Sequence, residues 1–332
     1  RQRQMCIRDS PGLQRMGRAE AGRAYRPVAR RTGLRPGRHR QPARARCHLK
    51  RLALSVLLGV LLSASGIAAA RERLVWLLRD LPPLTMFEGS QKNRGAVDQL
   101  LAMLTERMPE YDHSIQRVNR ARALQMLREP GFNCDPTLLR TPERDQFIHF
   151  SLPSMGTLSN GLIIRKQDQK LIEPFLVEDH VDLKALLTSQ PEKLGMVAER
   201  SYSTPIDDIL RDTPRDRLAP HYGVDAVRSL LQMQFLGRLK WLLGYWPEVR
   251  YLSQELGQPL DDLVFYPIQG VAEYQFIHVG CSKTVLGEQA IAHINQLLLD
   301  MRRDVLPPLY AHWLDPQTRE VYMEDARHFF DR

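Results

Sequence analysis

The residues with the clearest chemical potential lie between Asn133 and Lys166, around Arg144. Thr141, Pro142 and Glu143 precede this arginine and predict the start of a short helix. Threonine caps helices, proline fits the first helical position, and a carboxylate suits the positive end of the helix dipole. A guanidinium is a planar fork that can bind both oxygens of a carboxylate. Taken alone, Arg144 is either an anion-binding group or an ordinary arginine on a helix surface.

Signatures of catalysis and of metal binding are missing from the sequence after residue 70. It contains no GxxxxGK[ST], GxGxxG, HExxH or GxSxG motif, and Gly280 to Thr284 imitates only the end of a phosphate-binding loop. His149, His221 and His278 lack the spacing of metal ligands, so each is expected to be structural. We therefore predict no catalytic residue, no metal site and no cofactor.

Two cysteines, Cys134 and Cys281, follow residue 70. No CxxC motif is present, which argues against a redox motif or a zinc site. In an oxidising compartment the pair could form a disulfide, and two separate buried thiols are the alternative.

The net charge of +9 comes entirely from the start of the chain. Residues 1–70 hold 16 of the 47 Lys and Arg residues and 2 of the 38 Asp and Glu residues, so the other 262 residues carry 31 basic and 36 acidic side chains. This distribution argues against nucleic acid as a partner. Residues 1–47 are rich in Arg, Gly, Pro and Ala without apolar periodicity, and we expect a disordered, non-native leader. A basic arm that binds nucleic acid is the alternative.

Residues 48–70 are typical of a secretory signal peptide. His48 to Arg51 is positively charged, Leu52 to Leu62 is apolar, and Ser63 to Ala70 is rich in small residues. A membrane anchor is the alternative, but the segment lacks a basic stop-transfer flank. We expect cleavage after Ala70 and a monomeric protein in the periplasm.

The rest of the chain alternates strand and helix patterns. Leu74 to Leu78 is a continuous apolar run, as expected of a parallel strand covered on both faces, and Gly95 to Met108 has apolar residues at helical spacing. Trp76 and Trp241 lie within apolar runs and are expected in the core. The further expected strands are Tyr111 to Val118, Leu194 to Val197, Leu239 to Tyr245, Leu263 to Pro267 and Tyr274 to Val279. The further expected helices lie at Ala121 to Leu127, Asp182 to Leu187, Ser201 to Asp212, Val224 to Phe235, Ile291 to Met301 and Pro307 to Asp315. This alternation predicts an α/β fold. The 262 residues after residue 70 are more than a single small core needs, which favours two lobes over one.

The central stretch resembles a known family. Thr141 to Arg144, Phe150 to Pro153 and Gly161 to Lys166 are similar to the T-P-E-R, F-S-x-P and strand signature of bacterial extracellular solute-binding protein family 3. These are type 2 periplasmic binding proteins, which serve ABC importers for amino acids and related solutes. The resemblance implies two α/β lobes joined by two crossing hinge strands, near Ser159 to Arg165 and Phe276 to Lys283. It implies that residues 71–160 begin lobe one, residues 161–277 form lobe two, and residues 278–332 return to lobe one.

The resemblance also implies contacts with a ligand in lobe one. Arg144 matches the family arginine that pairs with the ligand's carboxylate, and Thr137 matches a hydroxyl that binds the same group. Leu139 stands where the family often has a second hydroxyl, so one polar contact is lost. Asp80 and Leu84 flank the first-strand loop, where the family often places an aromatic lid. Leu84 is not aromatic.

In lobe two the resemblance places Ser201 and Tyr202 where a loop meets a helix N-terminus, whose free N–H groups favour an anion. The family strand G-R-V-D-A-V-V-A-D ends in an aspartate that holds the ligand's ammonium group. Here Gly237 to Tyr245 places Tyr245 at that position and Lys240 at the inner acidic one. A tyrosine can stack or form a hydrogen bond, but it supplies no charge to balance an ammonium. This argues against an ordinary α-amino acid as the ligand.

We therefore expect a periplasmic solute-binding protein that captures a small carboxylate-bearing solute between its lobes for an ABC permease. A sensory module of the same fold, which signals to a membrane partner, is the alternative, and a dehydratase-type enzyme is a weaker one. The resemblance places Cys134 near the end of a lobe-one strand and Cys281 near the return crossing, which favours the disulfide.

Overall fold

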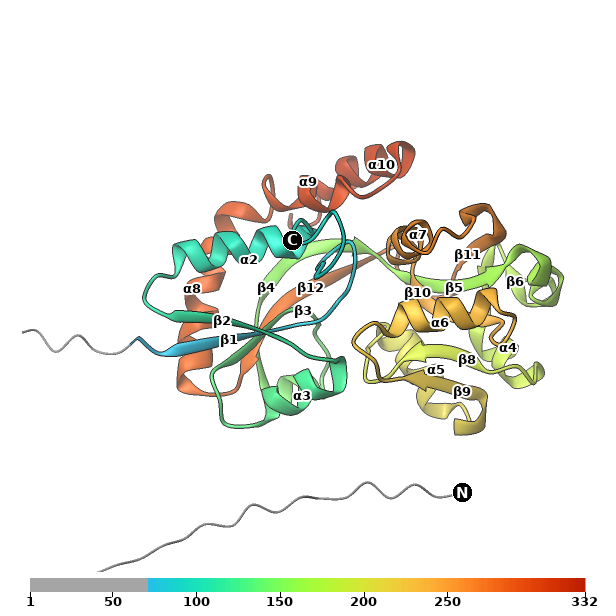
Figure 1. Ribbon diagram of the computed structural model, residues 1–332, viewed down its shortest axis with the longest axis horizontal. Helices are drawn as coiled ribbons and strands as arrows, with labels where there is room; N and C mark the ends of the chain where they lie inside the picture. The colour runs from blue at the N-terminus through green and yellow to red at the C-terminus, as the bar shows by residue number, and fades with distance from the viewer. Residues whose placement is uncertain (1–70, 332) are drawn as a thin grey trace, which may run out of the picture. The chain divides into compact units, whose positions relative to one another are not determined.

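The computed structural model describes residues 71–331, and the predicted leader and signal peptide lie outside them. Two five-stranded sheets organise this part of the chain, with helices packed on both (Figure 1). The expected α/β fold with two lobes is confirmed. Among the described residues, no helix is long and apolar enough to cross a membrane.

Lobe one contains the first sheet, in the strand order β2-β1-β3-β12-β4. The strands are β1 (Arg73–Leu78), β2 (Asp112–Arg117), β3 (Asn133–Leu139), β4 (Ile148–Leu158) and β12 (Tyr274–Ser282). β1 pairs in parallel with β2 and β3, whereas β12 runs antiparallel between β3 and β4. Leu74, Trp76 and Leu77 are completely buried, which confirms that β1 is covered on both faces.

Helices cover both faces of this sheet. They are α2 (Ala96–Arg107), α3 (Arg120–Arg128), α8 (Val285–Met301), α9 (Leu306–Ala311) and α10 (Pro316–Ala326). The larger core contains Trp76 and the apolar faces of α2, α8 and α9. The smaller core contains Leu77 and the apolar residues of α3. Alternate side chains of β1 therefore enter two different cores.

Lobe two contains the second sheet, in the strand order β11-β5-β10-β8-β9. The strands are β5 (Asn160–Arg165), β8 (Leu194–Val197), β9 (Leu218–His221), β10 (Trp241–Tyr245) and β11 (Leu263–Pro267), with a small hairpin of β6 (Leu176–Val177) and β7 (His180–Val181). The helices are α4 (Leu183–Ser189), α5 (Thr204–Asp212), α6 (Ala226–Phe235) and α7 (Trp246–Glu255). Trp241 is completely buried in the core, as predicted. Short 3-10 helices in the two lobes cover Arg144–Gln146, Lys166–Leu171, Glu173–Phe175, Arg215–Arg217 and Leu260–Asp262.

The chain crosses between the lobes twice. β4 continues through Ser159 into β5, and the segment after β11 leads into β12 (Figure 1). The two crossings lie side by side, because the Ser159 N–H donates to the Glu273 carbonyl over 2.8 Å and Tyr274 pairs with Leu158.

A disulfide joins Cys134 to Cys281. The two residues are partners in the pairing of β3 with β12, and both are completely buried. The predicted disulfide is therefore confirmed, and it fastens the returning strand to the first part of lobe one.

Candidate functional site

Four arginines are buried where the two lobes meet. We call Arg79, Arg120, Arg144 and Arg200 the arginine cluster, and their exposed fractions are 5%, 6%, 6% and 8%. Two buried carboxylates accompany them, Asp135 and Glu248, whose exposed fractions are 0% and 2%. Burying a charged group is costly unless it is paired, so the partners of each arginine define what the site can do.

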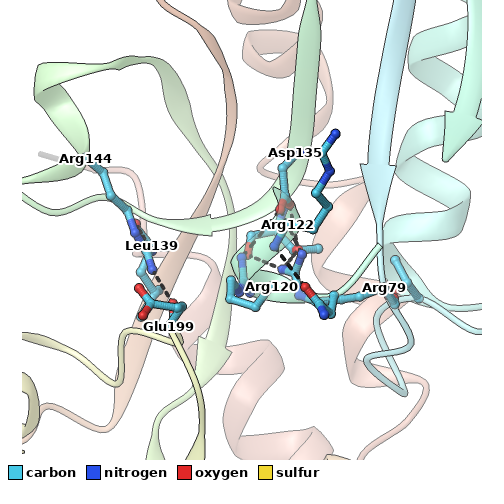
Figure 2. Close-up of polar contacts among 10 residues, drawn as sticks. Arg79, Arg120, Arg122, Asp135, Leu139, Arg144 and Glu199 are labelled. Carbon is cyan, nitrogen blue, oxygen red and sulfur yellow. Dashed lines mark hydrogen bonds and ion pairs between the residues drawn. The ribbon is translucent and has the colours of Figure 1, made fainter. Parts of the chain in front are cut away.

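The lobe-one half of the cluster is centred on Asp135 (Figure 2). The Arg79 Nη1 lies 2.8 Å from Asp135 Oδ2, and the Arg120 Nη1 lies 3.4 Å from the same oxygen. The hydroxyl and the backbone N–H of Thr137 both donate to Asp135 Oδ1 over 2.9 Å. The Thr137 hydroxyl also accepts a hydrogen bond from Arg79. One carboxylate therefore serves two guanidinium groups, and the predicted ligand contact Thr137 is already engaged.

Local structure explains this arrangement. Arg79 follows β1, Arg120 opens α3 directly after β2, and Asp135 lies on β3. Because β2, β1 and β3 are parallel neighbours, these residues meet at one edge of the sheet. Burial and the nearby Arg79 hold the pKa of Arg120 well below its ordinary value. Burial acts to raise the pKa of Asp135, but Arg79 and Arg120 outweigh it and hold this pKa below its usual range.

Arg144 connects the two lobes (Figure 2). Its Nη1 donates to the Leu139 carbonyl over 2.9 Å, and its Nη2 donates to the Glu199 carbonyl of lobe two over 3.2 Å. The Thr141 hydroxyl accepts a hydrogen bond from the Arg144 N–H over 3.3 Å, but the short 3-10 helix begins at Arg144 with Glu143 as its N-cap, later than predicted. Burial lowers the pKa of Arg144. Within residues 71–331 no carboxylate forms an ion pair with it, so its guanidinium is held by neutral carbonyls.

The lobe-two half of the cluster consists of Arg200 and Glu248. Two contacts of 3.0 and 3.4 Å join Arg200, in the loop before α5, to Glu248 on α7. Burial acts to lower the pKa of Arg200, but Glu248 outweighs it and the pKa stands above its ordinary value. The Arg200 guanidinium lies 5.6 Å from the ring centre of Tyr245, within range of a cation–π interaction. The Tyr245 hydroxyl donates to Gln275 Oε1 over 3.2 Å.

A small cavity of about 20 Å³ lies at the centre of the cluster, and a wider cleft of about 620 Å³ lies beside it. Arg144, Arg200 and Ser201 line both spaces. The ten residues that line the inner cavity include three arginines and no acidic residue. They are Leu81, Leu84, Arg120, Thr137, Leu139, Arg144, Arg200, Ser201, Tyr245 and Ile277.

The structure gathers most of the residues that the sequence singled out. Leu84, Thr137, Leu139, Arg144, Ser201 and Tyr245 line the inner cavity. The other two, Asp80 and Tyr202, do not line it. Asp80 accepts a hydrogen bond from the Phe87 N–H over 3.3 Å, and burial raises its pKa. Tyr202 is completely buried in lobe two, and its hydroxyl accepts from the Val197 N–H over 2.7 Å.

The N–H of Tyr202 is also occupied. It donates to Asp207 Oδ1 over 2.7 Å, and the Ser201 hydroxyl donates to the other oxygen of the same carboxylate. Burial raises the pKa of Asp207. An incoming anion therefore meets no free N–H at Tyr202.

Sequence reasoning missed Arg79, Arg120 and Arg200. Each of them follows the end of a parallel strand by one to three residues: Arg79 follows β1, Arg120 follows β2 and Arg200 follows β8. That position was the one available signal, since such strand ends gather at the same edge of a sheet.

Comparisons with known proteins agree on the fold. No protein-family model matches the sequence, and comparison with curated proteins gives no match either. Among solved structures, a mutant of ArgBP from T. maritima has a TM-score of 0.56 at 15% identity, over 73% of this chain and 95% of that one. The amino acid ABC transporter substrate-binding protein AbpA from Streptococcus pneumoniae, bound to L-arginine, has a TM-score of 0.53 at 14% identity, over 77% and 94%.

A histidine kinase sensor domain with similarity to periplasmic binding proteins has a TM-score of 0.57 at 15% identity, over 74% of this chain and 96% of that one. Transport proteins and a sensor domain thus share the architecture described above. The resemblance to solute-binding family 3 is confirmed at the level of the fold: this chain has the two-lobed fold of the periplasmic binding proteins.

Proposed function

We propose that the protein captures a small carboxylate-bearing solute between its lobes and presents it to an ABC permease. The observation that carries the proposal is the lining of the inner cavity, which has three arginines and no acidic residue. A carboxylate placed there would receive charge-assisted hydrogen bonds, which are about twice as strong as those between neutral groups. Following the predicted division, residues 71–160 and 278–332 would supply one half of the site and residues 161–277 the other.

Arg144 would couple ligand binding to closure of the lobes. Its two terminal nitrogens bond to carbonyls of different lobes, so the position of its guanidinium depends on how the lobes approach each other. A ligand that contacts Arg144 from lobe one and Arg200 from lobe two would favour the closed arrangement, because it binds that arrangement better than an open one. The closed form would then be the one that docks to the permease.

The lining also bears on the class of ligand. An α-amino acid needs a carboxylate for its ammonium group, and no carboxylate lines the inner cavity. Tyr245, at the family's aspartate position, directs its hydroxyl to Gln275. We propose an anionic ligand with an uncharged or aromatic portion facing Tyr245. Tight binding of a plain polar amino acid, measured by calorimetry, would refute this assignment.

Replacing Arg144 tests the proposal directly. Charged hydrogen bonds contribute about 1.5–3 kcal/mol each, so Arg144→Gln should weaken carboxylate binding by roughly 10-fold to 100-fold. Arg140→Gln is a matched control, since Arg140 is 57% exposed and pairs with Asp145 at the surface. Thermal-shift screening against organic acids, amino acids and peptides identifies the ligand, and calorimetry then compares the variants. Undiminished carboxylate binding by Arg144→Gln would exclude Arg144 as the clamp.

A sensory role is the second candidate, and the likeness to a histidine kinase sensor domain favours it. In that case the closed form would signal to a membrane partner without transport. The neighbouring genes separate the two roles: permease and ATPase genes favour the carrier, and a signalling gene favours the sensor. For either role we propose that residues 48–70 direct the chain to the periplasm.

A further inference from the structure

We propose that the site selects a compact dianion, such as a short dicarboxylate or an inorganic tetraoxyanion, over a monoanion of the same shape. This inference rests on the proposed function and narrows its ligand class. Arg120, which the family resemblance did not mark, would bind the second negative charge.

The charges of the cluster do not balance. The four arginines are accompanied by two buried carboxylates, Asp135 and Glu248, so these six side chains carry a formal charge of +2. The third buried carboxylate of the described residues, Asp168, pairs with Arg165. Arg200 is matched by Glu248 alone, whereas Asp135 is shared between Arg79 and Arg120. The lobe-one half therefore holds one guanidinium more than its carboxylate can neutralise, and Arg144 adds a second.

Arg120 is the more weakly paired of the two arginines at Asp135. Its contact is 3.4 Å long, against 2.8 Å for Arg79. The Nε atoms of both arginines are buried and have no acceptor among the described residues. Arg120 also lines the inner cavity, whereas Arg79 does not. A buried guanidinium with spare donors beside a cavity is poised to bind a second negative charge.

Two more carboxylates lie near the cluster, but neither lines the inner cavity. Asp207 is occupied by Ser201 and Tyr202, and it lines the outer cleft. Asp80 is occupied by Phe87 and approaches Arg117 at 3.9 Å. Arg144 and Arg200 line the outer cleft as well, and its other two arginines are paired at the surface, Arg128 with Glu143 and Arg211 with Asp208. The outer cleft therefore has as many acidic as basic side chains, whereas the inner cavity has three arginines and no acidic residue.

The size of the cavity favours a compact ligand. Its volume of about 20 Å³ leaves room for little more than a water molecule with the lobes as they stand in this structure. A short dianion needs only a modest separation of the lobes to reach Arg120, Arg144 and Arg200 together. A long ligand would have to leave part of its length in the outer cleft.

The test compares matched anions on the purified full chain by calorimetry. Malonate is paired with malonamate, which replaces one carboxylate by an amide of the same shape, and sulfate tests the inorganic source. We expect malonate or sulfate to bind at least about tenfold more tightly than malonamate, since a charged partner adds more than a neutral one. Binding of sulfate without malonate would support the inorganic class, and the reverse would support the organic class.

Variants then place the second charge at Arg120. Arg120→Gln should reduce the preference for malonate over malonamate to less than about threefold. The substitution removes the positive charge that attracts a second carboxylate more strongly than a neutral amide. Arg122→Gln is the control, since Arg122 lies on the same helix as Arg120 (Figure 2), is 47% exposed and pairs with Glu129. It should leave the preference unchanged. Arg120→Lys should keep part of the preference and serves if the glutamine variant does not fold.

The outcomes separate this inference from the proposed function. Equal binding of malonate and malonamate would overturn the dianion inference and leave the carboxylate-binding function standing. Retention of the preference in Arg120→Gln, or its equal loss in Arg122→Gln, would overturn the role of Arg120. Failure of the folded protein to bind any anion would overturn both.

Discussion

The disulfide supports a quantitative prediction about stability. Replacing both Cys134 and Cys281 by alanine removes a cross-link between residues 147 positions apart, a span that encloses all five strands of the lobe-two sheet. In the loop-entropy model, the cross-link restricts the unfolded chain and contributes about 5 kcal/mol at 25 °C for a loop of this length. Measured effects often fall below the model value, so we expect a loss of about 3–5 kcal/mol.

Urea unfolding, followed by tryptophan fluorescence, measures this loss. A change of that size should lower the urea midpoint by on the order of 1 M. The unmodified protein in reducing buffer should unfold like the alanine variant, and reductant should not affect the variant itself. A midpoint shift below about 0.2 M would refute the loop-entropy reasoning for this bond. Both sulfur atoms are completely buried, so reduction should become complete only as lobe one unfolds.

Three further predictions concern single side chains. Trp241→Ala should lower the free energy of unfolding by about 3–5 kcal/mol in chemical denaturation, because it empties a fully buried position of lobe two; a loss below about 1 kcal/mol would contradict the described core. Tyr245→Phe should lower the free energy of unfolding by about 1 kcal/mol in the same assay, since it removes only the hydrogen bond to Gln275 and keeps the ring beside Arg200. An unchanged free energy of unfolding would show that this hydrogen bond contributes nothing. Burial lowers the pKa of His278, whose ring forms a hydrogen bond with the Ser151 carbonyl. Folding therefore disfavours the charged ring, and the free energy of unfolding should decrease as the pH drops below the pKa of the unfolded state, about 6.5. His278→Gln should show a smaller loss of stability between about pH 7 and pH 5 in the same denaturation assay, and an identical pH dependence would exclude His278 as the source.

Much of the fold could be predicted because its signals are local. The apolar run at β1 and the buried Trp76 and Trp241 each followed from short stretches of sequence. The second crossing, expected near Phe276 to Lys283 from the family resemblance, lies before β12, which belongs to the lobe-one sheet. Two helices escaped prediction for physical reasons. α10 buries only Tyr322 and Ala326, so it has no apolar stripe, and α7 begins at Trp246 directly after β10 with no intervening loop.

The candidate site was harder to predict because its charges are scattered along the chain. Arg144 stood within a recognisable motif, whereas Arg79, Arg120 and Arg200 belong to no such motif and meet only through the arrangement of the strands. Their partners Asp135 and Glu248 carry no local mark either. Nothing in a linear pattern distinguishes a buried arginine from a solvated one until the sheet that surrounds it is known.

The position of β12 between β3 and β4 limits the order in which the protein can be completed. During synthesis, residues 73–158 emerge before the chain has made lobe two, and they leave β3 and β4 without the strand that separates them. A chain interrupted before Tyr274 would carry two unpaired strand edges, which are templates for association with other chains. Lobe two, whose five strands are contiguous in sequence, has no such dependence. Truncated or stalled chains should therefore associate with other chains through the unpaired strands of lobe one, although the first residues of this lobe are synthesised earliest.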